Sequence, residues 1–318
     1  MPVESSVRLI DPAEITRNPE NPRLIFREDE LVALEDSIAD QGILVPLTVY
    51  EEGVGEFVIL DGERRWRCAL KLGLTSVPAI VQTKPDEVTN IMMMFAIHKA
   101  RSDWDPLPTA MKLEKLGEIL SRRLGRDAKE SEIAAAASLS RGEVRRYRNI
   151  ILLPEKYKDL LLAELLKPRP QQKITVDLVL ETTRGAKALW QRSVISDDQQ
   201  WDLVDAVIEK FVANLIQSTV DPRMLPRIAR AVERGELSLK EARKVINKLI
   251  DDPKYTIQDA FSHSVEKIDF EHGTEQLVDR VISRFLEHVE REYELGGGLE
   301  EKLEALLKAV RRLKNANN

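Results

Sequence analysis

Asp61-Gly62-Glu63-Arg64-Arg65-Trp66-Arg67-Cys68-Ala69 is the stretch that decides the fold of this chain. An apolar run, residues 57–60, precedes it and is typical of a strand, and residues 66–72 have helical spacing. A strand that passes through glycine into a helix start is suited to holding an anion. The glycine permits close backbone approach, the helix N-terminus offers unpaired N–H groups, and two arginines add charge. The stretch therefore predicts a phosphate or polyphosphate ligand; the alternative is a surface arginine pair that caps a helix.

The sequence on either side of this stretch extends the pattern. Asn21-Pro22-Arg23 is followed by an amphipathic helical segment, residues 30–41. Residues 41–49 (QGILVPLTV) read as a glycine helix stop that leads into a strand, and residues 73–81 (GLTSVPAIV) as a further turn and strand. In this order the motifs resemble the N-terminal domain of the ParB family of chromosome and plasmid partition proteins. The ordered set is far more specific than any one motif, and it implies an α+β, ParB/sulfiredoxin-like domain.

Composition limits the class of protein. A chain of 318 residues with 32% charged and 5% aromatic residues is typical of a helix-rich protein of two or three domains. Its single cysteine, Cys68, excludes a disulfide framework within the chain and a thiolate metal cluster, and favours a reducing, cytoplasmic setting. No apolar run approaches the roughly 18 residues of a membrane helix, and residues 1–10 lack the pattern of a signal peptide. We expect no membrane partner and, by the resemblance, association with the nucleoid or a plasmid.

Periodicity divides the chain into three predicted parts. Residues 1–90 form the ParB-like nucleotide-binding domain, residues 91–168 a helical DNA-binding domain, and residues 171–318 a helical C-terminal region. Pro168 and Pro170 mark the second boundary, because neither residue can continue a helix. After residue 90 the pattern predicts helices over 111–124, 130–137, 141–152, 155–166, 176–180, 185–192, 202–215, 222–233, 238–249, 276–293 and 299–313.

Residues 130–148 have the form of a helix-turn-helix. The first helix is small and apolar, Leu139 lies in the turn, and Ser140 is a helix N-cap. Residues 117–150 hold eight basic and five acidic residues, a net charge of +3 in a chain of −6. Arginine suits both phosphates and guanine edges. The candidate DNA-binding residues are Lys129, Ser140, Arg141, Arg145, Arg146 and Arg148.

Taken without the family resemblance, residues 130–148 could also form a helical hairpin whose basic face is solvated and binds no DNA. The ParB family places its helix-turn-helix at a similar distance after the nucleotide domain and follows it with a Leu-Pro-Glu helix, which Leu153-Pro154-Glu155 matches. The resemblance therefore implies double-stranded DNA as a partner.

The resemblance also implies a nucleotide site. ParB-family proteins bind CTP with magnesium, hydrolyse it slowly and act as nucleotide-gated DNA clamps. The residue at the metal would be Glu63, and the loop at residues 42–46 would line the base. The residues implied to bind the nucleotide are Arg23, Gly42, Ile43, Pro46, Gly62, Glu63, Arg64, Arg65, His98 and Arg101.

The second nucleotide motif of the family differs in this chain. Ile97 and His98 stand where the family has an acid and an asparagine, whereas Arg101 is retained. Mg²⁺ prefers oxygen ligands, and isoleucine supplies none. Three questions therefore stay open: whether the nucleotide is CTP or another nucleoside triphosphate, whether Mg²⁺ binds, and whether the nucleotide is hydrolysed. Three roles stay open for His98. It could donate a hydrogen bond to a phosphate, act as a base, or be a partly buried side chain without a role in the site. The catalytic candidates, for a slow CTPase or another NTPase, are Glu63 and His98.

The C-terminal region offers an apolar stripe. Ile282, Phe285, Leu286 and Val289 share one helical face, and the last helix could pair with this one across Gly296–Gly298. We expect a homodimer, because a helix-turn-helix usually reads two half-sites; the family resemblance carries this expectation more than these residues do. The chain has no Walker-type phosphate loop, and its first residues do not predict a ParA-like motor as a partner.

Three functional hypotheses remain at this point. The first is a ParB-like, sequence-specific DNA-binding protein, regulated by a nucleoside triphosphate, in plasmid or chromosome partition or related regulation. The second is an enzyme on the same fold, a nucleotide-dependent kinase or nuclease; a sulfiredoxin is disfavoured because Cys68 lies beyond the arginines. The third is a nucleotide-independent DNA-binding adaptor.

Overall fold

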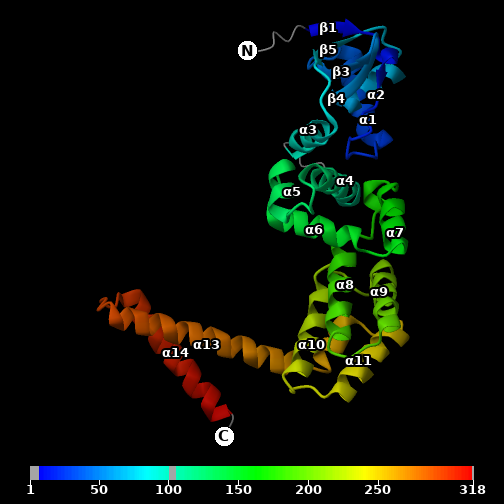
Figure 1. Ribbon diagram of the computed structural model, residues 1–318. Coiled ribbons are helices and arrows are strands. Elements are labelled where there is room, and N and C mark those ends of the chain that lie inside the picture. Colours follow the sequence, from blue (N-terminus) through cyan, green and yellow to red (C-terminus); the bar gives the residue numbers. More distant parts are fainter. Residues whose placement is uncertain (1–6, 100–104, 317–318) are drawn as a thin grey trace.

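The chain is elongated. The computed structural model describes residues 7–99 and 105–316, with the backbone alone at residues 98, 99 and 316. Figure 1 shows a small sheet domain at one end, a column of packed helices in the middle and two helices that project at the other end. Within the described residues, no helix combines the length and the apolar character that crossing a membrane requires.

Five strands form one mixed sheet in the order β1-β5-β3-β4-β2. Strand β3 lies parallel to β5 and antiparallel to β4, whereas the short β2 is parallel to β4 and β1 is antiparallel to β5. The strands are β1 (Val7–Ile10), β2 (Ile15–Thr16), β3 (Leu47–Gly53), β4 (Glu56–Asp61) and β5 (Val77–Gln82).

Strand β4 is buried on both faces. Phe57 and Ile59 point toward the face that packs with α2 (Glu63–Lys71). Val58 and Leu60 point to the opposite face, where Met94 of α3 (Glu87–Lys99) covers them. A strand covered on both sides is apolar at every position, which explains the continuous run at residues 57–60.

Helix α3 connects the sheet domain to the helices that follow. While Met94 packs on the sheet, Val88, Ile91 and Phe95 belong to a second buried cluster with the next three helices. These helices are α4 (Pro106–Leu124), α5 (Glu130–Ala136) and α6 (Arg141–Ile151). In the sheet domain itself, α1 (Glu28–Gln41) lies beside α2. The predicted α+β domain followed by helices is confirmed.

A third buried cluster runs from the first turn of α4 to Val265 and includes Tyr157 and Leu161 of α7. It continues across residues 168–171, where the chain makes a short 3₁₀ turn, Arg169–Gln171. The predicted domain limits stay a prediction. The helices before and after Pro168 and Pro170 share one apolar core. These helices are α7 (Glu155–Leu165), α8 (Val176–Trp190), α9 (Asp197–Val212), α10 (Leu225–Glu233), α11 (Leu239–Asp251) and α12 (Ile257–Ser262).

Helix α8 is continuous, whereas its sequence predicted two short helices. The hydroxyls of Thr182 and Thr183 donate to carbonyls one turn earlier, at 2.7 and 2.8 Å. Gly185 is buried against α10, and a Cβ there would lie 2.8 Å from Leu225 Cβ. The prediction was wrong because these residues, which weaken an isolated helix, here allow close helix packing.

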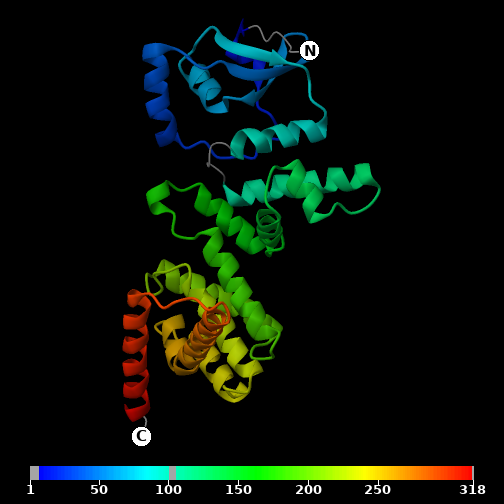
Figure 2. The ribbon, with the colours of Figure 1, turned by 90° about the vertical axis from the view of Figure 1, so that its left-hand side faces the viewer.

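The last two helices have little cover. The start of α13 (Glu266–Glu290) packs against the helical column and its far end projects away from it, while α14 (Gly297–Ala316) lies at an angle to α13 in both views (Figures 1 and 2). Leu286 is 60% exposed and Leu307 is 58% exposed. Among the described residues, the predicted pairing of these two helices does not bury their apolar faces.

Glu20 joins the sheet domain to α4. Its buried carboxylate accepts a hydrogen bond from Lys115 Nζ at 2.6 Å and pairs with Lys112 Nζ at 3.3 Å. Burial acts to raise the pKa of Glu20, but the two lysines outweigh it, and the pKa is held below its ordinary value.

This contact predicts a pH dependence. Because the folded-state pKa is lowered, the stabilisation is complete above the unfolded pKa of about 4.3 and is lost as the pH falls through the lower folded value. Glu20→Gln should lower the free energy of unfolding at neutral pH and flatten its decline below about pH 4.3. Denaturant unfolding of both proteins across this range measures the difference; parallel curves would show that Glu20 is not the source.

Candidate functional site

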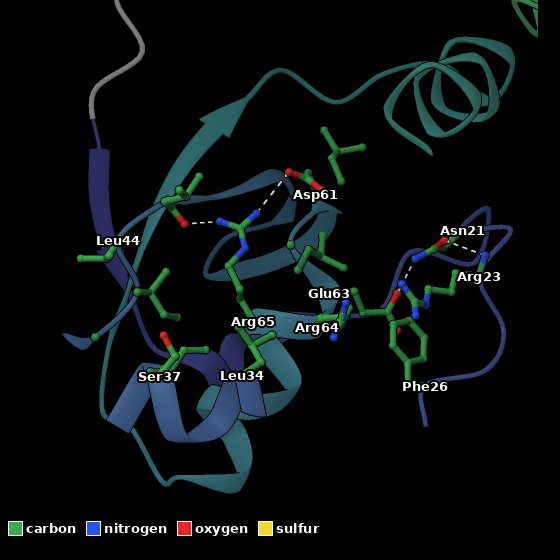
Figure 3. Close-up of a pocket in the computed structure, with 17 residues that line it drawn as sticks. Asn21, Arg23, Phe26, Leu34, Ser37, Leu44, Asp61, Glu63, Arg64 and Arg65 are labelled. Carbon is green, nitrogen blue, oxygen red and sulfur yellow. Dashed lines mark hydrogen bonds and ion pairs between the residues drawn. The ribbon is translucent and has the colours of Figure 1, made fainter. Parts of the chain in front are cut away.

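A cleft of about 450 Å³ opens where β4 ends and α2 begins. Figure 3 shows Arg64 and Arg65 between α1, which carries Leu34 and Ser37, and the segment with Asn21, Arg23 and Phe26. The lining residues are Asn21, Arg23, Phe26, Leu34, Ser37, Ile38, Gly42, Ile43, Leu44, Val45, Ile59, Leu60, Asp61, Gly62, Glu63, Arg64 and Arg65. Most of the apolar side chains come from α1 and the following loop, and the charged ones from α2 and the segment at residue 23.

Gly62 makes the turn from strand to helix possible. Its φ of +96° lies in the left-handed region that glycine favours. A Cβ at this position would lie 2.6 Å from Leu47 Cδ2 and 2.9 Å from Arg65 Nη2. Both the backbone angle and the space therefore require glycine.

Glu63 organises the first turn of α2. Its buried carboxylate accepts hydrogen bonds from Asn21 Nδ2 at 2.6 Å and from Arg67 Nη2 at 2.7 Å, and it pairs with Arg17 Nε at 3.3 Å. Breaking a buried, hydrogen-bonded charge pair is costly. In this arrangement Glu63 orients two guanidinium groups, and a metal ion at Glu63 would compete with them.

Arg65 fixes the loop that closes the cleft. Its Nη1 donates to the carbonyl oxygens of Val45 and, at 3.0 Å, of Pro46, while its Nη2 donates to Asp61 at 3.2 Å. Pro46 is therefore adjacent to the cleft without lining it. Gly42, with φ of +72°, ends α1 and begins this loop.

Arg64 and Arg23 meet at Glu30 of α1. Arg64 Nη2 donates to the Glu30 carbonyl at 2.6 Å, whereas the buried Arg64 Nε has no hydrogen-bond partner in the part of the chain that the structure describes. The Glu30 carboxylate pairs with Arg23 at 2.9 Å and with Arg169, which follows α7, at 2.9 Å. Burial acts to raise the pKa of Glu30, and the charges of Arg169 and Arg23 lower it below its ordinary value.

The cleft also contains an aromatic ring that the sequence analysis did not select. Phe26 lies under two guanidinium groups, with Arg67 Cζ 4.1 Å and Arg23 Cζ 5.3 Å from the ring centroid. Leu34 and Ile38 of α1 also line it. Their helical spacing was visible in the sequence, but spacing alone does not separate a cleft wall from ordinary core.

Seven of the ten residues that the family resemblance implied for a nucleotide are gathered in this cleft: Arg23, Gly42, Ile43, Gly62, Glu63, Arg64 and Arg65. The side chain of His98 and the whole of Arg101 lie outside the described residues. Their roles, and the catalytic roles of Glu63 and His98, stay predictions.

Magnesium stays a prediction as well. Among the described residues, no three His, Cys, Asp or Glu side chains gather where they could hold a metal ion. Ile97 packs beside Tyr50, Val58 and Leu60 on the sheet and supplies no oxygen.

The second candidate site is the helix pair α5–α6. Ser140 caps α6 by accepting from the Glu143 amide at 3.2 Å, and Ser138 in the turn has φ of +55°. Arg145 and Arg148 reach back to Glu130 of α5, at 3.1 and 3.7 Å.

The predicted DNA-binding residues lie on the exposed side of this pair. Lys129, Arg141, Arg145, Arg146 and Arg148 are all exposed. Arg146 pairs with Asp177 of α8 at 2.8 Å. The pair presents a basic surface, in which acidic neighbours hold several of the arginines.

Comparison with known proteins gave consistent matches. The family model described as "ParB N-terminal domain" matches residues 2–96. A nucleoid occlusion protein of Geobacillus sp. (strain WCH70) is 32% identical over 220 residues, which are 62% of this chain and 77% of that protein. A chromosome-partitioning protein ParB of Caulobacter vibrioides (strain NA1000 / CB15N) is 32% identical over 155 residues, 48% of this chain and 49% of that protein. The chain thus matches about half the length of that relative.

Among solved structures, the C-terminally truncated ParB from Caulobacter crescentus complexed with CTP-gamma-S is similar. It is 29% identical, and the match covers 51% of this chain and 87% of that one, with a TM-score of 0.29.

The turn at Gly62 generates a prediction. Gly62→Ala should lower the free energy of unfolding for two reasons. The left-handed backbone costs an alanine about 1–2 kcal/mol, and the overlap of its Cβ with Leu47 and Arg65 costs about 1–3 kcal/mol. Gly73→Ala is the matched control, because Gly73 also has a positive φ of +65° but has nothing within 4 Å of its Cβ position. The free energy of unfolding of both variants measures the difference. Equal losses would mean that only the backbone angle demands glycine at residue 62.

Proposed function

This chain belongs to the ParB family, and from that premise we propose that it is a sequence-specific DNA-binding protein regulated by CTP. It acts in plasmid or chromosome partition or in related regulation. The observation that carries the proposal is the arginine-lined cleft at the N-terminus of α2, where a glycine turn leaves the first helix amides without a side-chain cap beside Arg64.

The chemistry of the cleft favours a nucleoside triphosphate. Its volume of about 450 Å³ suits a small organic ligand. The helix N-terminus and Arg64, whose buried Nε has no partner, supply donors for phosphate oxygens. Ile43, Leu44 and Leu34 form the apolar wall that a base requires. The choice of CTP follows the family resemblance.

The DNA-reading element in this proposal is α6. Its arginines are exposed, and Arg145 and Arg148 share one acidic partner, Glu130. The hydrogen bond from Arg145, chiefly, lowers the pKa of Glu130 below its ordinary value. A DNA phosphate or guanine edge would replace Glu130 as the acceptor, so recognition requires these arginines to leave α5.

The proposal includes a homodimer held by α13 and α14. Their apolar residues, among them Ile282, Leu286 and Leu307, are exposed in the single chain. An exposed apolar surface of this extent marks an association site, and a dimer supplies the two recognition helices that a two-fold DNA site needs.

Nucleotide binding tests the first part. Isothermal titration of the full chain with CTP, ATP, GTP and UTP, each with and without Mg²⁺, should give selective binding of CTP. Arg64→Glu should abolish it, because the substitution places a negative charge beside the phosphates. Arg8→Glu is the control, since Arg8 is exposed on β1 and makes the same change of charge away from the cleft.

Two outcomes would contradict this assignment. Normal CTP binding by a folded Arg64→Glu variant would remove the phosphate site from α2. Absence of binding for all four nucleotides would leave the nucleotide-independent DNA-binding adaptor as the function.

Sedimentation tests the dimer. The double variant Ile282→Asp/Leu286→Asp should sediment as a monomer at concentrations where the wild type is a dimer, because a buried unpaired carboxylate is costly. Arg280→Asp/Arg284→Asp is the matched control, since these residues lie on the opposite face of α13. A dimer that survives the first pair of substitutions would show that other residues hold it.

A further inference from the structure

A second basic site lies far from the helix-turn-helix, between α10 and α13. Arg227, Arg230 and Arg234 follow one face of α10 and its C-terminus, and they line a groove of about 270 Å³ opposite His272 and Gly273 of α13. From Arg223 to Lys248 the sequence holds eight basic and three acidic residues, a net charge of +5 in a chain of −6. This segment is more basic than the helix-turn-helix segment.

Among the described residues, the side chains of two of the three arginines have no partner. Arg227 pairs with Asp269 at 3.0 Å. The side chains of Arg230 and Arg234 make no ion pair and no hydrogen bond with a described residue, although the chain has 54 acidic residues against 48 basic ones. Like charges repel one another in a concave site, and a bound anion would relieve that repulsion.

The far wall of the groove is also arranged for an anion. His272 pairs with Glu236 at 2.5 Å and with Glu275 at 3.2 Å. The hydrogen bond with Glu236 raises the pKa of His272 above its ordinary value, which favours the cationic ring at this wall. The acidic lining residues, Glu236 and Asp269, are thus each paired with a basic side chain of the groove, His272 and Arg227.

Gly273 keeps the groove open. It lies inside the long helix α13, where glycine costs about 0.5–1 kcal/mol relative to alanine. Nothing lies within 4 Å of a Cβ placed there, so helix packing does not require a glycine. Its absent side chain leaves space opposite Arg230 and Arg234.

We propose that the groove between α10 and α13 binds phosphate groups through Arg230 and Arg234, and that these belong to the backbone of duplex DNA outside the site read by α6. That the phosphates belong to DNA rests on the proposed function. That the groove binds phosphate does not depend on it. Contacts to phosphates position a protein on the duplex but carry no sequence information, so the contribution of the groove is independent of sequence.

The first arm of the test measures binding to a duplex of arbitrary sequence by fluorescence anisotropy over a range of salt concentrations. Arg230→Glu/Arg234→Glu should lower the slope of log K against log salt by about 2, because each phosphate contact releases about one counterion. Gly273→Leu should weaken binding without any change of charge, while its melting temperature stays at or above that of the wild type.

The control is Arg184→Glu/Lys187→Glu, which reverses two exposed charges on α8 outside the groove. An equal loss in this control, or full binding by Gly273→Leu, would overturn the DNA assignment. Sedimentation of each variant confirms that the oligomeric state is unchanged.

The second arm is independent of DNA. Inorganic phosphate should shift the ring proton resonances of His272, assigned with His272→Gln among the four histidines of the chain, and Gly273→Leu should abolish the shift. A shift without any effect on DNA binding identifies a free phosphate compound as the ligand. If phosphate moves no His272 resonance and the salt slope is unchanged, the groove is not a phosphate site. If the wild type binds no duplex at all, the proposed function fails while this arm still decides the phosphate chemistry.

Discussion

The buried carboxylate of Glu63 is the interaction on which the anion cleft depends. One carboxylate receives Asn21, Arg67 and Arg17 at the first turn of α2. It thereby ties the segment near residue 21 to the helix that follows β4. Without this acceptor the guanidinium groups of Arg17 and Arg67 would lie at the start of α2 with no negative charge between them. Gly62 acts on the same turn, since only a residue without a side chain leaves room for Leu47 and Arg65.

Charge in the cleft is balanced by a few shared acids. Glu30 alone holds Arg23, Arg27 and Arg169 and accepts from Arg64 through its carbonyl. Through Arg169 this acid also joins the wall of the cleft to the end of α7. The cleft and the helical column therefore share partners as well as a core, because α3 contributes apolar residues to clusters on both sides.

The sequence predicted the sheet domain well because its signals are local. Strand β4, the glycine turn and the arginines of α2 are contiguous, and their order matches a known family. Phe26 and Leu34 were missed because their place in the cleft depends on how α1 packs against the loop at residues 42–46. The single helix α8 was missed because helix propensity depends on local sequence alone. It cannot include the packing of Leu225, which approaches Gly185 from another helix. The groove at Arg230 was missed for the same reason, since Arg230 and Gly273, on its two walls, are 43 residues apart in sequence.

Burial of β4 on both faces has a consequence for local stability along the chain. Amide hydrogens in a strand covered by α2 and α3 exchange only when the whole domain opens, whereas the distal half of α13 opens at little cost in free energy. Gly62 and the arginines after it lie at the end of this strand. The cleft therefore keeps its shape between encounters with a ligand, while the two C-terminal helices adjust to the surface that they meet.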